Sequence, residues 1–418
     1  MAYGQRPHRR SNALIVTVLA AVWVAFPFFL GSEALARQRP KTHFLSWESL
    51  RRPEEFRRLD KRVRPLRRFN LSRRRVVKLK KSSFWNRRPY QFSTPLVYEG
   101  RIYLGVDAGF FYAVDMSPPS KRWTFRAEGP IQAQASAADD AVYFGDCKGF
   151  VYALERASGD LLWKVKLDAE IMAKPLVAGN RLYVVTMSGR LFALDRQRGV
   201  EIWHTDASER GFGFAVRRCA DPVLKNGLIY VGTSAGTLFA YRASDGQIVW
   251  VRQLGDRRSM VYDLDSTPLF AHNCLYVTSS DQRLSCLGPT EGRVVWSIDV
   301  GGANDLLFHK DRLYVSDGGS LYAVEPATGQ LLWQQDLETP GLSAPAAGKD
   351  FIAIVSTSDK LYLIDDDTGD IVYERYIRKG SFGDPVVVGD QVFVLSNSSR
   401  LFSFRVRELP PRKVRGEK

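Results

Sequence analysis

A tryptophan recurs about every 40 residues along the greater part of this chain. Six tryptophans and one tyrosine hold this place, at spacings of 40, 40, 47, 46, 37 and 40 residues: Trp123, Trp163, Trp203, Trp250, Trp296, Trp333 and Tyr373. A fixed period of about 20 to 50 residues is the signature of a repeat architecture, in which each unit buries its apolar surface against its neighbours. The chain is therefore expected to fold as an array of similar modules.

Each unit has the same internal order. A short run with proline is followed by an apolar run, a turn, a second apolar run and a turn that ends in glycine before the tryptophan; in the fourth unit the last four parts are residues 227–231, 235–236, 237–241 and 245–250. Alternating runs rich in β-branched and aromatic residues, separated by Gly or Asp-Gly turns, predict strands joined by hairpins. Four strands at this period predict a β-propeller blade. We interpret the recurring aromatic residue as a packing residue between neighbouring blades.

Eight such units follow one another, and the last is incomplete. Their starts lie near Ser93, Gln134, Ala173, Ala220, Ser266, Asp305, Ser343 and Gly383. The final unit stops after three strands, whereas residues 75–80 have the length and alternation of an outer strand. We therefore predict an all-β, eight-bladed β-propeller with four-stranded antiparallel blades over residues 75–408, closed by the strand 75–80 and followed by a tail at 409–418.

An apolar segment near the start of the chain predicts membrane targeting. Residues 13–30 are uncharged and follow Arg9 and Arg10, and at about 1.5 Å per residue they could span most of a ~30 Å hydrocarbon layer. Their length favours an uncleaved anchor, whereas Ala34-Leu35-Ala36 offers a cleavage site, so residues 1–36 are a signal anchor or a signal peptide. We expect the body that follows to be exported to the periplasm, although the positive charges after the segment leave its orientation open.

The positive charge of the chain is concentrated in one region. The net charge is +15, yet residues 37–90 alone carry 20 Lys and Arg against 4 Asp and Glu. The rest of the body is slightly acidic, which argues against a domain that wraps nucleic acid. The basic arm, residues 37–74, either binds an anionic membrane or another acidic polymer or is a solvated tether. Within it, residues 51–63 predict a short amphipathic helix that lies on a membrane or packs on the propeller.

Two adjacent connections between units are six or seven residues longer than the others. They contain residues 209–218 and 256–266, and in a propeller both emerge on one face. Extra length on one face predicts a binding site, and the first connection carries aromatic residues beside arginine, a combination frequent in interface hot spots. The alternative is a pair of slightly longer surface loops without a partner.

The units resemble the pyrroloquinoline-quinone-type propeller repeats, whose blade pattern is found here from Tyr230 to Trp250. Within that group, residues 91–405 look most like the BamB family of outer-membrane protein assembly factors, through residues 214–222 and the segment 263–268, Asp-Leu-Asp-Ser-Thr-Pro. The resemblance implies a non-enzymatic envelope scaffold that docks on the barrel-inserting subunit of the β-barrel assembly machinery. It also implies the docking residues, which are Phe214, Val216, Arg217, Asp263 and Asp265. The alternative is an envelope propeller that binds an anionic membrane or polymer through its basic arm.

A quinone-dependent dehydrogenase is a further alternative, because related propellers are such enzymes. Such enzymes share a pair of cysteines adjacent in sequence and a calcium shell. The four cysteines here are not adjacent to one another; they are Cys147, Cys219, Cys274 and Cys286. The acidic run 365–367 is interpreted as a turn. We therefore expect no enzymatic activity, no cofactor and no metal. Cys274 and Cys286 lie on neighbouring predicted strands, where they form a disulfide or, if the register puts them on opposite faces, remain buried thiols.

Overall fold

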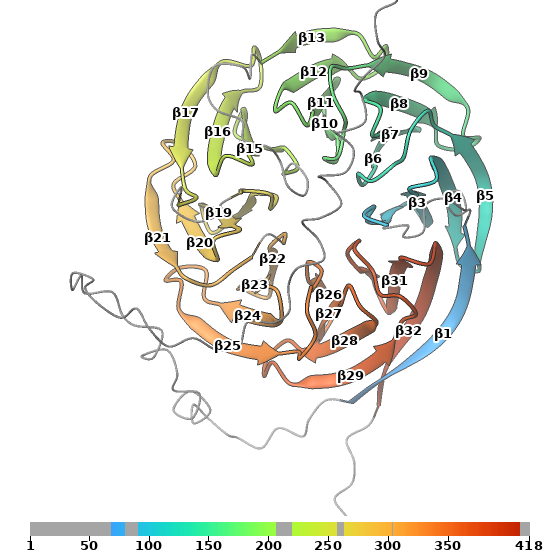
Figure 1. Ribbon diagram of the computed structural model, residues 1–418, viewed down its shortest axis with the longest axis vertical. Helices are drawn as coiled ribbons and strands as arrows, with labels where there is room; N and C mark the ends of the chain where they lie inside the picture. The colour runs from blue at the N-terminus through green and yellow to red at the C-terminus, as the bar shows by residue number, and fades with distance from the viewer. Residues whose placement is uncertain (1–67, 80–90, 206–219, 257–262, 303, 410–418) are drawn as a thin grey trace, which may run out of the picture. The chain divides into compact units, whose positions relative to one another are not determined.

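The computed structural model describes residues 68–79, 91–205, 220–256, 263–302 and 304–409. They form eight four-stranded sheets, which follow one another around a common centre (Figure 1). The predicted eight-bladed, all-β propeller with antiparallel blades is thereby confirmed. The membrane-targeting segment, the predicted helix 51–63 and the arm as far as residue 67 lie outside the described residues. The part of the chain that is described contains no helix with the length and apolarity needed to cross a membrane.

The first four blades are consecutive along the chain. Blade 1 consists of β2 (Leu96–Tyr98), β3 (Arg101–Gly105), β4 (Phe110–Met116) and β5 (Pro119–Arg126). Blade 2 consists of β6 (Ser136–Ala138), β7 (Ala141–Gly145), β8 (Phe150–Glu155) and β9 (Leu161–Lys166). Blade 3 consists of β10 (Leu176–Ala178), β11 (Arg181–Val185), β12 (Leu191–Asp195) and β13 (Glu201–His204). Blade 4 consists of β14 (Val223–Lys225), β15 (Leu228–Gly232), β16 (Thr237–Arg242) and β17 (Ile248–Gln253).

The next three blades repeat this order, and the last borrows a strand. Blade 5 consists of β18 (Leu269–Ala271), β19 (Cys274–Ser279), β20 (Arg283–Leu287) and β21 (Val294–Ile298). Blade 6 consists of β22 (Leu307–His309), β23 (Arg312–Ser316), β24 (Ser320–Val324) and β25 (Leu331–Asp336). Blade 7 consists of β26 (Ala346–Ala347), β27 (Phe351–Val355), β28 (Lys360–Asp365) and β29 (Ile371–Tyr376). Blade 8 consists of β30 (Val386–Val388), β31 (Gln391–Ser396), β32 (Arg400–Leu409) and β1 (Arg68–Lys78).

The first strand of each blade begins two or three residues after the predicted start. In blade 1 the start was expected near Ser93, whereas β2 begins at Leu96, directly after Pro95. Proline has no N–H to donate to a sheet, so it is confined to the edge or the beginning of a strand. The residues before it therefore belong to the connection between blades.

The apolar cores lie at the seams between neighbouring blades. Eight clusters of buried side chains each join the facing sides of two blades that are adjacent in the ring. On β15, Ile229 and Val231 pack toward blade 3, whereas Tyr230 packs toward blade 5. Because the middle strands are buried on both faces, their apolar residues form continuous runs in place of the expected alternation. Alternation survives on outer strands such as β9, whose side chains are exposed and half-buried in turn toward its end.

The N-terminal strand β1 closes the last blade. It pairs antiparallel with β32, from Arg68 opposite Leu409 to Lys78 opposite Arg400. It begins seven residues earlier and ends two residues earlier than the predicted strand 75–80, so residues 68–74 belong to the sheet and not to the arm. The register shifts at a bulge between Arg73 and Arg75, and a bulge changes which side chains face each side. The bulge and the surrounding arginines conceal the strand in the sequence.

Candidate functional site

The loops of the propeller emerge on two faces. Because each blade is a meander, the turns between its second and third strands lie on the same face as the connections between blades; we call this the connection face. The turns between first and second and between third and fourth strands lie on the other face, which we call the turn face. The two long connections join β13 to β14 and β17 to β18, on the connection face of blades 3, 4 and 5. Residues 206–219 and 257–262 of these connections lie outside the described residues.

The described end of the second long connection is held between blades 4 and 5. The Leu264 N–H donates to the Thr233 carbonyl (3.0 Å), and the Ser280 N–H donates to the Asp263 carbonyl (2.9 Å). The Leu264 side chain is buried in the core between these blades. Gly232 allows this close approach, because a Cβ there would lie 2.4 Å from the Leu264 carbonyl oxygen.

The following residues tie the same connection to blades 5 and 6. The Ser266 hydroxyl donates to the Thr278 carbonyl (3.0 Å), and the Thr278 N–H donates back to Ser266 Oγ (3.2 Å). The Thr267 N–H donates to Asp305 Oδ1 (2.6 Å). The backbone of residues 263–267 is therefore fixed by three blades before it enters β18.

The two carboxylates predicted to dock a partner are buried. Asp263 is 5% exposed and Asp265 is 2% exposed, and both interact with other groups of the chain. Burying a charge is costly unless it is compensated, so these side chains act inside the connection and offer almost no surface. The other three predicted docking residues, Phe214, Val216 and Arg217, lie outside the described residues.

Three aspartates that were not predicted as site residues tie together the segments that lead into the first strands of neighbouring blades. Asp305 is the one that holds Thr267. The Lys174 N–H likewise donates to Asp221 Oδ1 (2.7 Å), and the Thr94 hydroxyl donates to Asp384 Oδ2 (2.9 Å) between blades 8 and 1. The available signal was an acidic residue shortly before the first strand of a blade, as in the two Asp-Pro pairs at 221–222 and 384–385.

Each recurring tryptophan packs on a glycine in the next blade. A Cβ on that glycine would lie 2.5 to 2.8 Å from the nearest ring atom. The pairs are Trp123–Gly159, Trp163–Gly199, Trp203–Gly246, Trp250–Gly292, Trp296–Gly329 and Trp333–Gly369. Tyr373 takes the seventh place and packs against the core between blades 7 and 8. These aromatic side chains lie at the blade seams.

The acidic run 365–367 lies on the turn face of blade 7. The side chain of Asp365 accepts the N–H of Asp367 (2.9 Å), which is the pattern of a local turn. Asp366 is fully buried and contacts the Lys310 ammonium at 2.8 Å. Burial opposes the charge on Lys310, but hydrogen bonds to Asp366 and Asp350 outweigh it and raise the pKa of the ammonium. The three carboxylates lie close enough together to hold a cation, and the Lys310 ammonium already supplies one beside them.

A disulfide joins the two middle strands of blade 5. Cys274 on β19 and Cys286 on β20 are bonded, with their Cα atoms 5.8 Å apart. Cys286 lies opposite Tyr276 in the register, so the two cysteines are diagonal neighbours on one face of the sheet. Cys147 is a free thiol, and burial raises its pKa to about 12.

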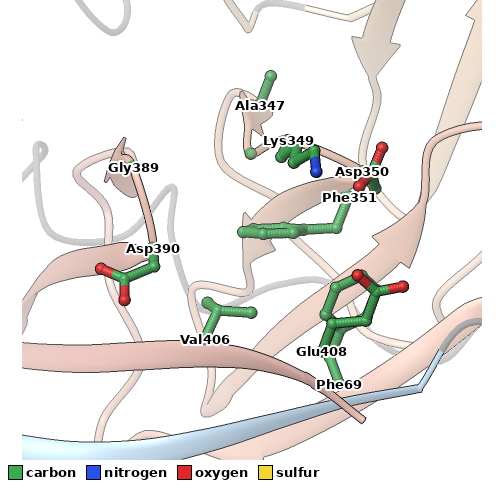
Figure 2. A pocket seen from close by; sticks show the side chains of 10 residues that line it. Phe69, Ala347, Lys349, Asp350, Phe351, Gly389, Asp390, Val406 and Glu408 are labelled. Atoms are coloured by element: carbon green, nitrogen blue, oxygen red, sulfur yellow. The ribbon is translucent and has the colours of Figure 1, made fainter. Parts of the chain in front are cut away.

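An open pocket of about 470 Å³ lies on the turn face where blades 7 and 8 meet (Figure 2). Its floor contains Phe69 and Phe351, whose ring centroids are 5.4 Å apart in an edge-to-face arrangement, together with Val406. Figure 2 shows Phe351 above Val406, between the carboxylates of Asp390 and Glu408. An apolar floor with a charged rim suits a ligand that has both kinds of surface.

Comparison with known proteins identifies the repeat. The family model described as outer membrane protein assembly factor BamB matches residues 112–320 and 317–408. BamB from Moraxella catarrhalis has a similar structure, with a TM-score of 0.69 and 22% identity over 80% of this chain and 100% of that chain. None of the curated protein sequences matches this chain.

Two dehydrogenases have similar structures as well. A europium-containing methanol dehydrogenase matches with a TM-score of 0.67 and 12% identity over 80% of this chain and 93% of that chain. A quinohemoprotein alcohol dehydrogenase from Pseudomonas putida HK5 matches with a TM-score of 0.66 and 14% identity over 82% of this chain and 78% of that chain. At such low identity the structural similarities show a shared propeller fold alone.

Proposed function

Because the chain belongs to the family of the outer membrane protein assembly factor BamB, we propose that its propeller is a non-enzymatic scaffold that holds other proteins in the cell envelope. The observation that carries this proposal is the family match, which extends from β4 to β32. A rigid ring of blades that presents long connections on one face is suited to position partners.

The proposed docking surface is the connection face of blades 3 to 5, and the proposed partner is the barrel-inserting subunit of the β-barrel assembly machinery. Phe214, Val216 and Arg217 would supply apolar and cationic contacts of the kind that dominate interfaces. Asp263 and Asp265 would act as positioning residues, because both are buried. The fixed backbone of residues 263–267 supports this role, since a pre-ordered support lowers the cost of binding.

The proposed location is the periplasm, with residues 13–30 as the membrane-targeting segment. The disulfide between Cys274 and Cys286 supports export, because disulfides persist in oxidising compartments such as the bacterial periplasm and are rare in the cytosol. A propeller retained in the cytosol would keep both cysteines reduced.

Photo-crosslinking from the connection face tests this proposal. A photoreactive amino acid is placed at Phe214 or Val216 of the full chain in cells, with Glu291, an exposed residue on the turn face of blade 5, as the control position. We expect one membrane-protein partner to be captured from the first two positions and not from Glu291. Capture from Glu291 alone, or from no position while the variants melt like the wild type, would contradict the proposed docking surface.

Charge variants separate direct contact from support. Arg217→Glu should abolish co-purification of the partner without changing the melting temperature if Arg217 touches the partner. Asp263→Asn should lower both the melting temperature and the yield of partner, since a support role acts through the fold. An Asp263→Asn chain that melts normally and still loses its partner would show instead that this carboxylate contacts the partner.

A quinone-dependent dehydrogenase is the second candidate, because two dehydrogenases share the fold. Enzymes of this type share a pair of cysteines adjacent in sequence. This chain has four cysteines, and no two of them are adjacent. Incubating the full chain with pyrroloquinoline quinone, calcium and an alcohol, and following the reduction of a dye, distinguishes the two candidates. The scaffold proposal predicts no dye reduction.

Binding of an anionic surface is the third candidate, because residues 37–90 carry 20 Lys and Arg against 4 Asp and Glu. Deleting residues 37–66 leaves β1 intact and removes ten of these 20 basic residues together with the four acidic ones. If the arm binds anionic lipid, the deletion should weaken sedimentation with phosphatidylglycerol vesicles and flatten its salt dependence. If the arm is only a tether, the full chain and the chain without residues 37–66 should sediment equally well with the vesicles.

A further inference from the structure

We propose that the pocket between blades 7 and 8 is a second docking site, which receives a basic side chain flanked by apolar neighbours from a partner protein. The pocket lies on the turn face, opposite the connection face on which the proposed assembly function relies. The inference therefore stands on observations of its own, and its test does not depend on that function.

The pocket lies where the ring differs from the other seven blades. In those blades the third strand is joined to the fourth by a turn on this face. In blade 8 the third strand, β32, ends at Leu409, and the fourth strand, β1, enters from the N-terminal side at Arg68. No turn joins these two strands, and their ends supply Phe69, Val406 and Glu408 to the pocket lining.

The pocket is formed by rigid backbone. The Gly348 N–H donates to the Phe351 carbonyl (2.8 Å), and the Val406 N–H donates to the Asp390 carbonyl (2.7 Å). Gly348 lies directly on the ring, because a Cβ there would be 2.2 Å from Phe351. A preformed site of this kind loses little conformational freedom when it binds a ligand.

The charged groups of the lining leave one carboxylate for a ligand. Three carboxylates and one ammonium line the pocket, from Asp350, Asp390, Glu408 and Lys349. Asp350 is paired with Lys310 at 2.9 Å, and Asp390 is paired with Arg405, and neither of these cations lines the pocket. Glu408 is exposed, and no cation pairs with it among the described residues. Its carboxylate is therefore available to an incoming basic group.

The floor and the volume indicate which basic group fits. The small exposed part of Phe69, Phe351 and Val406, which are 7%, 3% and 6% exposed, gives the floor an apolar surface for the methylene stem of a lysine or arginine. A cavity of about 470 Å³ falls within the usual range of ligand sites, about 300 to 1,000 Å³, which leaves room for an apolar neighbour. Lys349 is exposed on a turn and can turn its ammonium to solvent.

A pair of matched peptides tests the proposal. Fluorescently labelled acetyl-Leu-Arg-Leu-amide and its neutral citrulline analogue are titrated into the full chain, and binding is followed by anisotropy. We expect the arginine peptide to bind at least about tenfold more tightly than the citrulline peptide, because a charge-assisted contact is lost in the analogue. The basic arm repels the positively charged arginine peptide, so the arm cannot cause tighter binding of this peptide than of the citrulline peptide.

Two variants assign the binding to the pocket. Glu408→Gln should weaken the arginine peptide about fivefold or more and leave the citrulline peptide unchanged, whereas Glu291→Gln, the same change at an exposed site on the turn face of blade 5, should alter neither. Equal affinity of the two peptides, or an unchanged affinity in Glu408→Gln, would overturn the proposal. Binding that appears only after residues 410–418 are removed would also overturn it, because the occupant would then be the chain's own basic tail.

Discussion

The ring of Trp163 lies directly on Gly199, across the seam between blades 2 and 3. A Cβ on Gly199 would lie 2.5 Å from Trp163 Cε3, and the glycine has a φ of +69°. The Trp163 indole N–H donates to the Arg196 carbonyl (3.0 Å) in the same turn. The pair therefore sets the distance between the two blades through the ring face and the ring edge together.

Gly199→Ala should weaken this seam. The left-handed φ costs about 1–2 kcal/mol for any other residue, and displacing the ring adds about 1–3 kcal/mol of overpacking. Gly179→Ala is the matched control, because Gly179 has a φ of +58° but open space around its Cβ position. Denaturant unfolding should show a larger loss for Gly199→Ala, and equal losses would mean that the ring does not depend on the glycine.

Removing β1 should open the last blade. Deleting residues 1–79 takes Phe69, Leu71, Val77 and Leu79 out of two cores and exposes the edge of β32. Losing four buried apolar side chains should lower the melting temperature by about 10 °C or more and promote aggregation through the free edge. Truncation after residue 66 keeps β1 and should leave the transition unchanged. If both truncations melt alike, β1 does not close the ring.

The blades were predictable because every unit has the same local pattern of apolar runs, glycine-containing turns and a recurring aromatic residue. The start of β1 was not predictable, because the bulge between Arg73 and Arg75 changes which neighbouring blade the buried side chains face, blade 7 for Leu71 and blade 1 for Val77. A run of arginines also looks like a solvated arm. The repeated strands and turns are therefore enough to predict the ring. The extent of the irregular edge strand β1 is set by its pairing with β32.

The candidate sites were less accessible to sequence reasoning. The burial of Asp263 follows from contacts of its segment with Thr233 and Ser280, which come from two different blades. The pocket requires Phe69 and Glu408, which meet only when the ring closes. The disulfide remained an open question in the sequence, because the strand register that puts Cys274 and Cys286 on one face of the sheet is set by the fold.

The disulfide of blade 5 should contribute measurably to stability. Cys274 and Cys286 are 12 residues apart, and closing a short loop of this kind is worth about 2–4 kcal/mol in the chain-entropy model. The double variant Cys274→Ala/Cys286→Ala should lose about this amount of unfolding free energy, as should the wild type in reductant. Cys147→Ala should respond to reductant like the wild type, whereas the double variant should not respond. A wild type that is insensitive to reductant would mean that the bond does not form.

The ammonium of Lys310 should compensate the buried carboxylate of Asp366. Lys310→Met removes the 2.8 Å ion pair with Asp366 and keeps the weaker contact from His309, whose Nε2 lies 3.6 Å from Asp366, and should cost about 1–3 kcal/mol. Adding Asp366→Asn should recover part of the loss, which a double-mutant cycle measures.

Because the pKa of Lys310 is raised in the fold, the contribution of its ammonium to stability is present below its ordinary pKa of about 10.4 and disappears as the pH rises through the raised value. Wild type and Lys310→Met should therefore converge in stability at strongly alkaline pH, and a constant difference would contradict the pairing.

The thiol of Cys147 should be almost inert at neutral pH. Its pKa of about 12, compared with about 8.5 for an ordinary cysteine, lowers the reactive thiolate fraction at pH 8 by about three orders of magnitude. In a Cys219→Ser background, iodoacetamide should label Cys147 slowly, and the rate should rise about tenfold per pH unit beyond pH 9, where an exposed thiol levels off. Denaturant should restore ordinary reactivity, which is the control for intrinsic chemistry.

Because the folded state holds the Cys147 proton more tightly than the unfolded state, the stabilising contribution of this thiol is complete below pH about 8.5 and is lost as the pH rises toward 12. A labelling rate that levels off near pH 9 in the folded protein would show that burial does not protect the thiol.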